Sequence, residues 1–235
     1  MNVRSAREPL SLDRVVAAAT SLADAEGLRV VTMRRVADEL DCEAMSLYYY
    51  VRDKGTLLTA LTEAVVGEIC AASLDPSLAE GAAGWREVVR RRCLAARRVM
   101  LRHPWAPRLV AAQPTAPSTA YALFEALVAT MVDGGCTYSL AHRAIHALGS
   151  MLLGFTQELF EPDTGDAEVS AEEMAALELA MPHLARIAEV AAHESEGSLS
   201  VCDTQAEFEF TLGLVLDGLE AHRLRGQAPI VSGTR

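Results

Sequence analysis

The stretch from Thr32 to Lys54 reads TMRRVADELDCEAMSLYYYVRDK, and its pattern predicts two short helices joined by a tight turn. Thr32 is a favourable N-cap for the first helix, because its hydroxyl can accept a hydrogen bond from a free amide of the first turn. Val36, Ala37 and Leu40 then recur at helical spacing and form one apolar face. The pattern breaks at residues 41–42, which we interpret as the turn.

The second predicted helix begins after Glu43, whose negative charge is favourable at a helix start. Leu47 and Val51 lie four residues apart and are expected to point inward. The side chains left facing outward are those of Ala44, Met45, Ser46, Tyr48 and Tyr49. Two tyrosines and a methionine on a short surface helix are unusual for a surface that contacts only solvent, and they indicate a binding surface.

Four cations surround this outward face: Arg34, Arg35, Arg52 and Lys54. Cations and hydroxyls can hold DNA phosphates while an outward helix face contacts base edges in the major groove. This combination is typical of a helix-turn-helix that binds DNA. The predicted DNA-binding residues are Thr32, Met33, Arg34, Arg35, Ala44, Met45, Ser46, Tyr48, Tyr49 and Lys54.

The segment from Leu12 to Lys54, with the leucines at 57 and 58, resembles the DNA-binding domain of the TetR family of bacterial repressors. The resemblance is carried by Gly27 and Leu28, the run TMRRVA at 32–37, the run LYYYV at 47–51, and Lys54 followed by the leucines. It covers about the first quarter of the chain and implies double-stranded operator DNA as a partner. The alternative is a helical domain with a chance cluster of tyrosines.

The composition predicts an all-α protein. Of the 235 residues, 51% are hydrophobic, which is enough for one or two globular domains with a sizeable core. Alanine and leucine are abundant and favour helices, and no stretch shows the alternating β-branched pattern of strands. Residues 1–54 carry a net charge of −1 and residues 55–235 a net charge of −10. An acidic body of this kind discourages non-specific adhesion to DNA.

These patterns, together with the family resemblance, imply four segments: a flexible arm at 1–10, a helix-turn-helix DNA-binding domain at 11–60 (the head), a helical ligand-binding and dimerisation domain at 61–225, and a tail at 226–235. The arm has two interpretations. In one, Arg4 and Arg7 bind in a DNA minor groove, and in the other the arm is a disordered tail. Beyond the head, helices are expected at 54–72, 85–103, 118–132, 137–160, 171–193 with an interruption at Pro182, and 204–224.

Arginines crowd the helix predicted at 85–103 and fall around much of its circumference. A second nucleic-acid patch is one interpretation, but solvated cations or cations paired with the acidic body are the expectation we prefer. Arg92 is the member that we expect to face an interior cavity. The set comprises Arg86, Arg90, Arg91, Arg92, Arg97, Arg98 and Arg102.

A soluble protein of the cytoplasm is expected. The five cysteines are widely spaced, with no C-x-x-C pair, which favours free thiols over disulfides or a metal site. The polar start of the chain does not read as a signal peptide, and no uninterrupted apolar run reaches membrane-spanning length.

The C-terminal pattern also resembles the tetracycline-repressor branch of the TetR family. That resemblance implies that the helices at 137–160 and 204–224 pack across a two-fold axis in a homodimer. A dimer is expected on physical grounds too, because two recognition helices about 34 Å apart read a palindrome that one short helix cannot.

The same resemblance implies a small-molecule inducer in a cavity lined by Cys70, Arg92, Ala96, Leu127, His142, Ile145 and Glu158. In that branch a histidine and a glutamate hold the drug's magnesium. Glu158 matches the glutamate, but no histidine occurs from Arg108 to Val110, where the other ligand would lie. We therefore expect an apolar pocket with a few polar anchors, and neither a cofactor nor a metal.

His142 and His146 lie four residues apart on one predicted helix, a spacing that can bind a metal. No third ligand is evident, so two ordinary helix histidines are the favoured interpretation. Motifs of helical metalloenzymes, nucleotide-binding loops and hydrolases do not occur. A non-enzymatic, ligand-responsive repressor is therefore predicted. The alternative is a helical small-molecule-binding or scaffold dimer that does not bind DNA.

Overall fold

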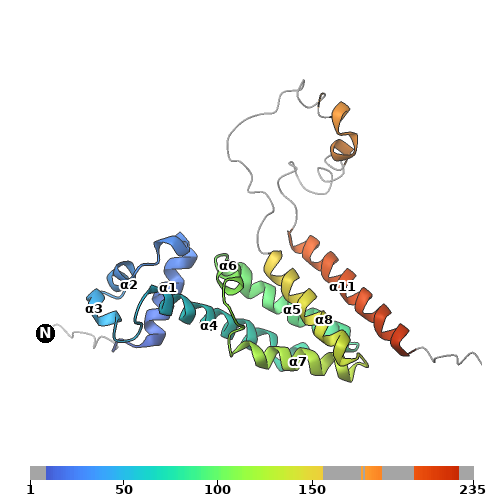
Figure 1. Ribbon diagram of the computed structural model, residues 1–235, viewed down its shortest axis with the longest axis horizontal. Coiled ribbons are helices and arrows are strands. Elements are labelled where there is room, and N and C mark those ends of the chain that lie inside the picture. The colour runs from blue at the N-terminus through green and yellow to red at the C-terminus, as the bar shows by residue number, and fades with distance from the viewer. Residues whose placement is uncertain (1–8, 156–175, 177, 187–203, 228–235) are drawn as a thin grey trace, which may run out of the picture. The chain divides into compact units, whose positions relative to one another are not determined.

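The computed structural model describes residues 9–155, 176, 178–186 and 204–227 (Figure 1). All regular elements in these ranges are α-helices or short 3-10 helices, which confirms the predicted all-α class. The chain divides into two compact units: one holds residues up to 156 together with those from 216 onward, and the other holds residues 157–215.

The head consists of α1 (Leu12–Glu26), the 3-10 helix η1 (Leu28–Val30), α2 (Met33–Glu39) and α3 (Ala44–Leu47). Ser11 caps α1 by accepting a hydrogen bond from the Arg14 amide at 3.2 Å, as its position predicts. Gly27 ends α1 with a φ of 84°, a backbone conformation that glycine adopts without steric cost.

Helix α4 (Lys54–Ser73) begins within the head and is the longest helix that lies wholly in the first unit. Asp53 caps it, because Asp53 Oδ1 accepts a hydrogen bond from the Thr56 amide at 2.7 Å. By length and hydropathy alone α4 could cross a membrane. Leu57 and Leu61 are instead fully buried in the protein core, as in the core helix of a globular fold.

The rest of the first unit is built from η2 (Pro76–Leu78), α5 (Trp85–Arg102), α6 (Ala106–Ala111), α7 (Ala120–Asp133) and α8 (Tyr138–Gly154). Helix α4 packs against α5, and α7 packs against α8 (Figure 1). Thr137 caps α8 through its hydroxyl. Helix α8 ends at Gly154, before the predicted end at residue 160. Residues 156–160 lie outside the described residues.

Helix α11 (Thr204–Gln227) runs three residues beyond its predicted end. Between α8 and α11, the described residues 178–180 and 182–186 are helical. They are separated by Met181, immediately before Pro182. A residue before proline avoids helical geometry, so the break lies where the sequence predicts it.

One continuous hydrophobic core joins the head to the helices that follow. It contains Val15 of α1 and Leu47 of α3, together with Leu57 of α4, Val99 of α5 and Trp105. The predicted domain boundary near residue 60 thus lies inside a shared core, and it stays a prediction.

The arginines of α5 differ from one another in burial. Arg91 pairs with Glu87, Arg102 with Glu68, and Arg86 with Asp217, as expected for cations in an acidic body. Arg97 is fully buried, and its Nη1 donates to the Phe155 carbonyl at 2.7 Å. The sequence does not predict this burial, because the spacing of the arginines does not distinguish Arg97 from its neighbours.

Candidate DNA-binding surface and ligand site

Helix α3 is a single turn with buried side chains on its inner side and solvent-exposed side chains on its outer side. Leu47 and Val51 are 0% and 1% exposed, so the inward pair lies where the spacing places it. Met45 and Tyr49 are 73% and 86% exposed on the opposite side. The helix is shorter than predicted, because residues 48–50 form a turn, and Glu43 stands at its start without a side-chain capping bond.

The residues of α2 in the predicted DNA-binding set have different surroundings. Thr32 caps the helix, since its hydroxyl accepts a hydrogen bond from the Arg35 amide at 3.2 Å. Arg34 is exposed, whereas the guanidinium of Arg35 forms an ion pair with Glu26 of α1. Met33 is partly buried against the core, as is Ala44 of α3.

Tyr50, which the sequence assigned no role, anchors the start of the described chain. Its hydroxyl donates to the Leu10 carbonyl at 2.7 Å, and its ring meets that of Tyr49 edge-on, with centroids 5.2 Å apart. Tyr48, Tyr49 and Ser46 are exposed beside it, and Lys54 is exposed in the first turn of α4. We call the exposed side chains of Met45, Ser46, Tyr48 and Tyr49 the α3 face, and they project from the turn whose Leu47 and Val51 are buried.

Three of the seven predicted ligand-binding residues, Cys70, Ala96 and Leu127, are buried between helices. The Cys70 thiol donates to the Thr119 carbonyl at 3.2 Å, and burial raises the pKa of that thiol. Nη1 of Arg92 donates to the Ala126 carbonyl at 2.7 Å and to Thr130 Oγ1 at 2.8 Å.

Three further members of the ligand set lie on α8 or after it. Ile145 is partly buried and His142 is exposed, while Glu158 lies outside the described residues. The rings of His142 and His146 meet edge-on with centroids 4.7 Å apart. Among the described residues, no group of three or more His, Cys, Asp or Glu could hold a metal ion.

A cavity of about 260 Å³ opens between α4 and the segment that joins α6 to α7. Gln113 Nε2 donates to Thr62 Oγ1 at 3.3 Å across it, and Thr119 Oγ1 donates to Glu63 at 2.9 Å. Its position differs from that of the predicted ligand residues, because it depends on Gln113, after α6, meeting Thr62 of α4. The lining residues are Thr59, Thr62, Glu63, Gln113, Thr115, Ala116, Pro117, Ser118 and Tyr121.

Residues 76–223 match the sequence pattern of the tetracyclin repressor-like C-terminal domain. Similar curated proteins include an HTH-type transcriptional regulator of Saccharopolyspora erythraea, 31% identical over 75% of this chain and 74% of that protein. The HTH-type transcriptional repressor DrrR1 of Streptomyces coeruleorubidus is 31% identical over 92% of this chain and 80% of its own length.

Solved structures share the same fold. A possible TetR family transcriptional regulator from Streptomyces coelicolor A3(2) has a TM-score of 0.70 and 30% identity, covering 90% of this chain and all of that one. The TetR family protein ActR of Streptomyces coelicolor, solved in complex with actinorhodin, has a TM-score of 0.69 and 26% identity, covering 92% of this chain and 99% of that one.

Proposed function

Because the chain belongs to the TetR family of transcriptional regulators, which are not enzymes, we propose that it is a ligand-responsive repressor that binds a palindromic operator as a homodimer. A small molecule releases it from DNA. The protein acts in the cytoplasm, where operator DNA and the inducer are both present.

The observation that carries this proposal is the α3 face. Met45, Tyr48 and Tyr49 are 73%, 44% and 86% exposed, although each has a large apolar surface that water does not favour. The buried Leu47 and Val51 hold this face rigidly to the core. A rigid, exposed aromatic surface flanked by Arg34 and Lys54 suits base edges between two rows of phosphates.

The operator is a palindrome, because a four-residue recognition helix reads only a few base pairs. Two copies about 34 Å apart double the length that is read and match the two-fold symmetry of a dimer. By family resemblance, α8 and α11 supply the dimer interface.

The inducer is a small, mostly apolar compound. ActR, which shares 26% identity with this chain, has been solved with actinorhodin. We propose Cys70, Arg92, Ala96, Leu127, His142, Ile145 and Glu158 as the residues near the inducer. The inducer shifts the population toward a state in which the two heads no longer fit successive grooves, and its effect equals its difference in affinity for the two states.

Fluorescence anisotropy with DNA from upstream of the protein's own gene tests this function. Saturation at two monomers per palindrome, surviving competitor DNA, is the expected result. Binding no tighter than to random DNA would instead favour the alternative, a helical small-molecule-binding or scaffold dimer without DNA-binding activity.

A further inference from the structure

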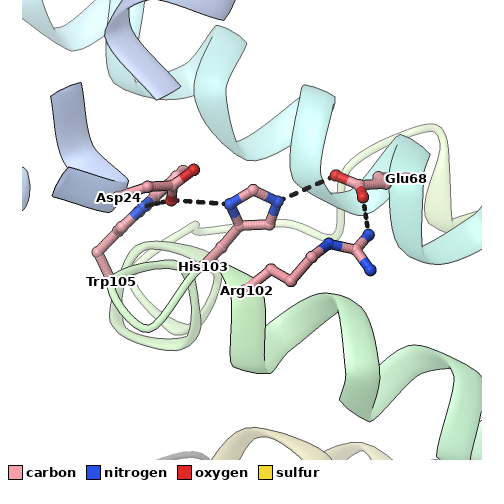
Figure 2. Close-up of polar contacts among 5 residues, drawn as sticks. All are labelled: Asp24, Glu68, Arg102, His103 and Trp105. Atoms are coloured by element: carbon pink, nitrogen blue, oxygen red, sulfur yellow. Dashed lines mark hydrogen bonds and ion pairs between the residues drawn. The ribbon is translucent and has the colours of Figure 1, made fainter. Parts of the chain in front are cut away.

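A buried histidine at the corner between α5 and α6 contacts both the head and α4. His103 is 6% exposed. Its Nδ1 lies 2.8 Å from Asp24 Oδ1 on α1, and its Nε2 lies 3.0 Å from Glu68 Oε2 on α4. Figure 2 shows the imidazole standing between the two carboxylates. One side chain thus bridges two helices that are 44 residues apart at these positions.

Neighbouring donors hold both carboxylates in place. Trp105 Nε1 donates to Asp24 Oδ1 at 2.6 Å, and the Arg102 guanidinium pairs with the other carboxylate oxygen of Glu68, Oε1 (Figure 2). The charged groups that face the ring are therefore Asp24 from α1, Glu68 from α4 and, through Glu68, Arg102 from α5. Both carboxylates are anchored independently of the histidine.

The contacts of His103 depend on its protonation. An ionised carboxylate only accepts hydrogen bonds, and a neutral imidazole has a single N–H to donate. Both contacts are hydrogen bonds only when both ring nitrogens carry protons. In the neutral ring, one nitrogen lone pair faces a carboxylate oxygen, so one of the two contacts becomes repulsive.

We propose that His103 is a proton-dependent clamp that fastens the α5–α6 corner to α1 and α4 at the same time. With both protons present, the head and α4 are held together. When the ring carries a single proton, one side opens and the head loosens. The consequence for operator binding rests on the proposed function, whereas the clamp itself is a property of the free protein.

Two conservative substitutions separate a clamp from ordinary packing. His103→Gln keeps a polar side chain but cannot switch its charge, so the clamp stays weak at every pH. Glu68→Gln keeps an oxygen for Arg102 and presents an amide donor to Nε2. A neutral His103 could then accept from that amide and donate to Asp24, which closes the clamp without the second proton.

Hydrogen exchange of the full-length free protein, compared as protection factors at pH 5.5 and pH 8.5, tests the clamp. In the wild type, protection of α1 should fall several-fold at the higher pH. It should be low at both values in His103→Gln and high at both in Glu68→Gln. Glu87→Gln, which breaks an ion pair elsewhere on α5, should keep the wild-type profile.

An identical pH profile in the wild type and in both His103→Gln and Glu68→Gln would overturn the clamp. If His103→Gln fails to fold, the flattening expected in Glu68→Gln still decides the question. Operator affinity at the two pH values is measured alongside. Absence of specific DNA binding would contradict the proposed function and leave the exchange result standing as a separate test.

Discussion

Adjacent tyrosines in the head carry out different tasks. Tyr50 uses its hydroxyl to hold the Leu10 carbonyl, and its ring supports the edge of Tyr49. Tyr49 has no such anchor for its own exposed ring and is 86% exposed. The spacing of Leu47 and Val51 predicts that Tyr49 points outward, but only the folded chain separates the supporting tyrosine from the presented one.

Replacing Tyr49 by alanine should weaken operator binding without unfolding the protein. Loss of a base contact costs about 1–3 kcal/mol, so affinity should fall about tenfold or more. An exposed substitution changes stability by about 0.5 kcal/mol or less. Anisotropy and urea unfolding measure the two effects. Tyr121→Ala removes an exposed tyrosine from α7 as a control, and equal losses of affinity in both variants would argue against the α3 face.

Arg97 is a residue whose removal should be costly for the fold. Its guanidinium is buried and donates to the Phe155 carbonyl at the end of α8. Arg97→Ala leaves a cavity and takes away that donor, which should lower the free energy of unfolding by about 3 kcal/mol. Arg98→Ala, on the exposed side of α5, should stay within about 0.5 kcal/mol. Similar midpoints for both variants in urea would contradict this assignment.

At the scale of elements, α4 links the proposed DNA-binding surface, the cavity and the proposed clamp. Its first residue, Lys54, lies beside the α3 face, and Thr59 and Thr62 line the cavity. Glu68 then contacts His103. Hydrogen bonds from Thr56 hold the Asp53 carboxylate at the start of the helix and lower its pKa from the usual value of an aspartate. A small shift of one rigid helix would therefore reach the DNA surface, the cavity and the clamp together.

The junction between α7 and α5 is packed closely enough to test by adding one methyl group. A Cβ at Gly134 would lie 2.4 Å from Cγ of Trp85, although the φ of −75° suits any residue. Gly134→Ala should therefore destabilise the protein by about 1–3 kcal/mol through overpacking.

Gly67→Ala is the matched control for this junction. Gly67 lies inside α4, and a Cβ added to it would have no other packing neighbour within 4 Å. The substitution should therefore stabilise the helix by up to about 1 kcal/mol. Thermal unfolding distinguishes the two variants. A stable Gly134→Ala protein would mean that Trp85 can move aside.

At the scale of the whole molecule, the distribution of charge should control DNA binding. In the proposed complex, three cations from each of two heads, Arg34, Arg35 and Lys54, would make about six phosphate contacts, which predicts a slope of log affinity against log salt of about −5. Arg34→Ala changes both heads and should reduce the magnitude of that slope by about 2. Arg98→Ala on α5 should leave it unchanged. A slope near zero in the wild type would contradict binding through phosphates.

How far the sequence predicts each feature depends on the range of the interactions that determine it. The helix caps at Ser11 and Thr32 each join a side chain to an amide three residues away. Because these contacts are local, the sequence predicts them. The cavity beside α4 depends on Gln113 meeting Thr62 from a distant loop. The burial of Arg97 likewise depends on the end of α8, which no local pattern of arginines indicates.

The sequence by itself determined the all-α class, the helix-turn-helix and the outward direction of Tyr48 and Tyr49, because helical periodicity and capping act within one or two turns. Only the tertiary structure decided that one core joins the head to α5 and that His103 lies between Asp24 and Glu68. Those contacts join residues tens of positions apart. Their partners are selected by how whole helices pack, and spacing along the chain does not encode that choice.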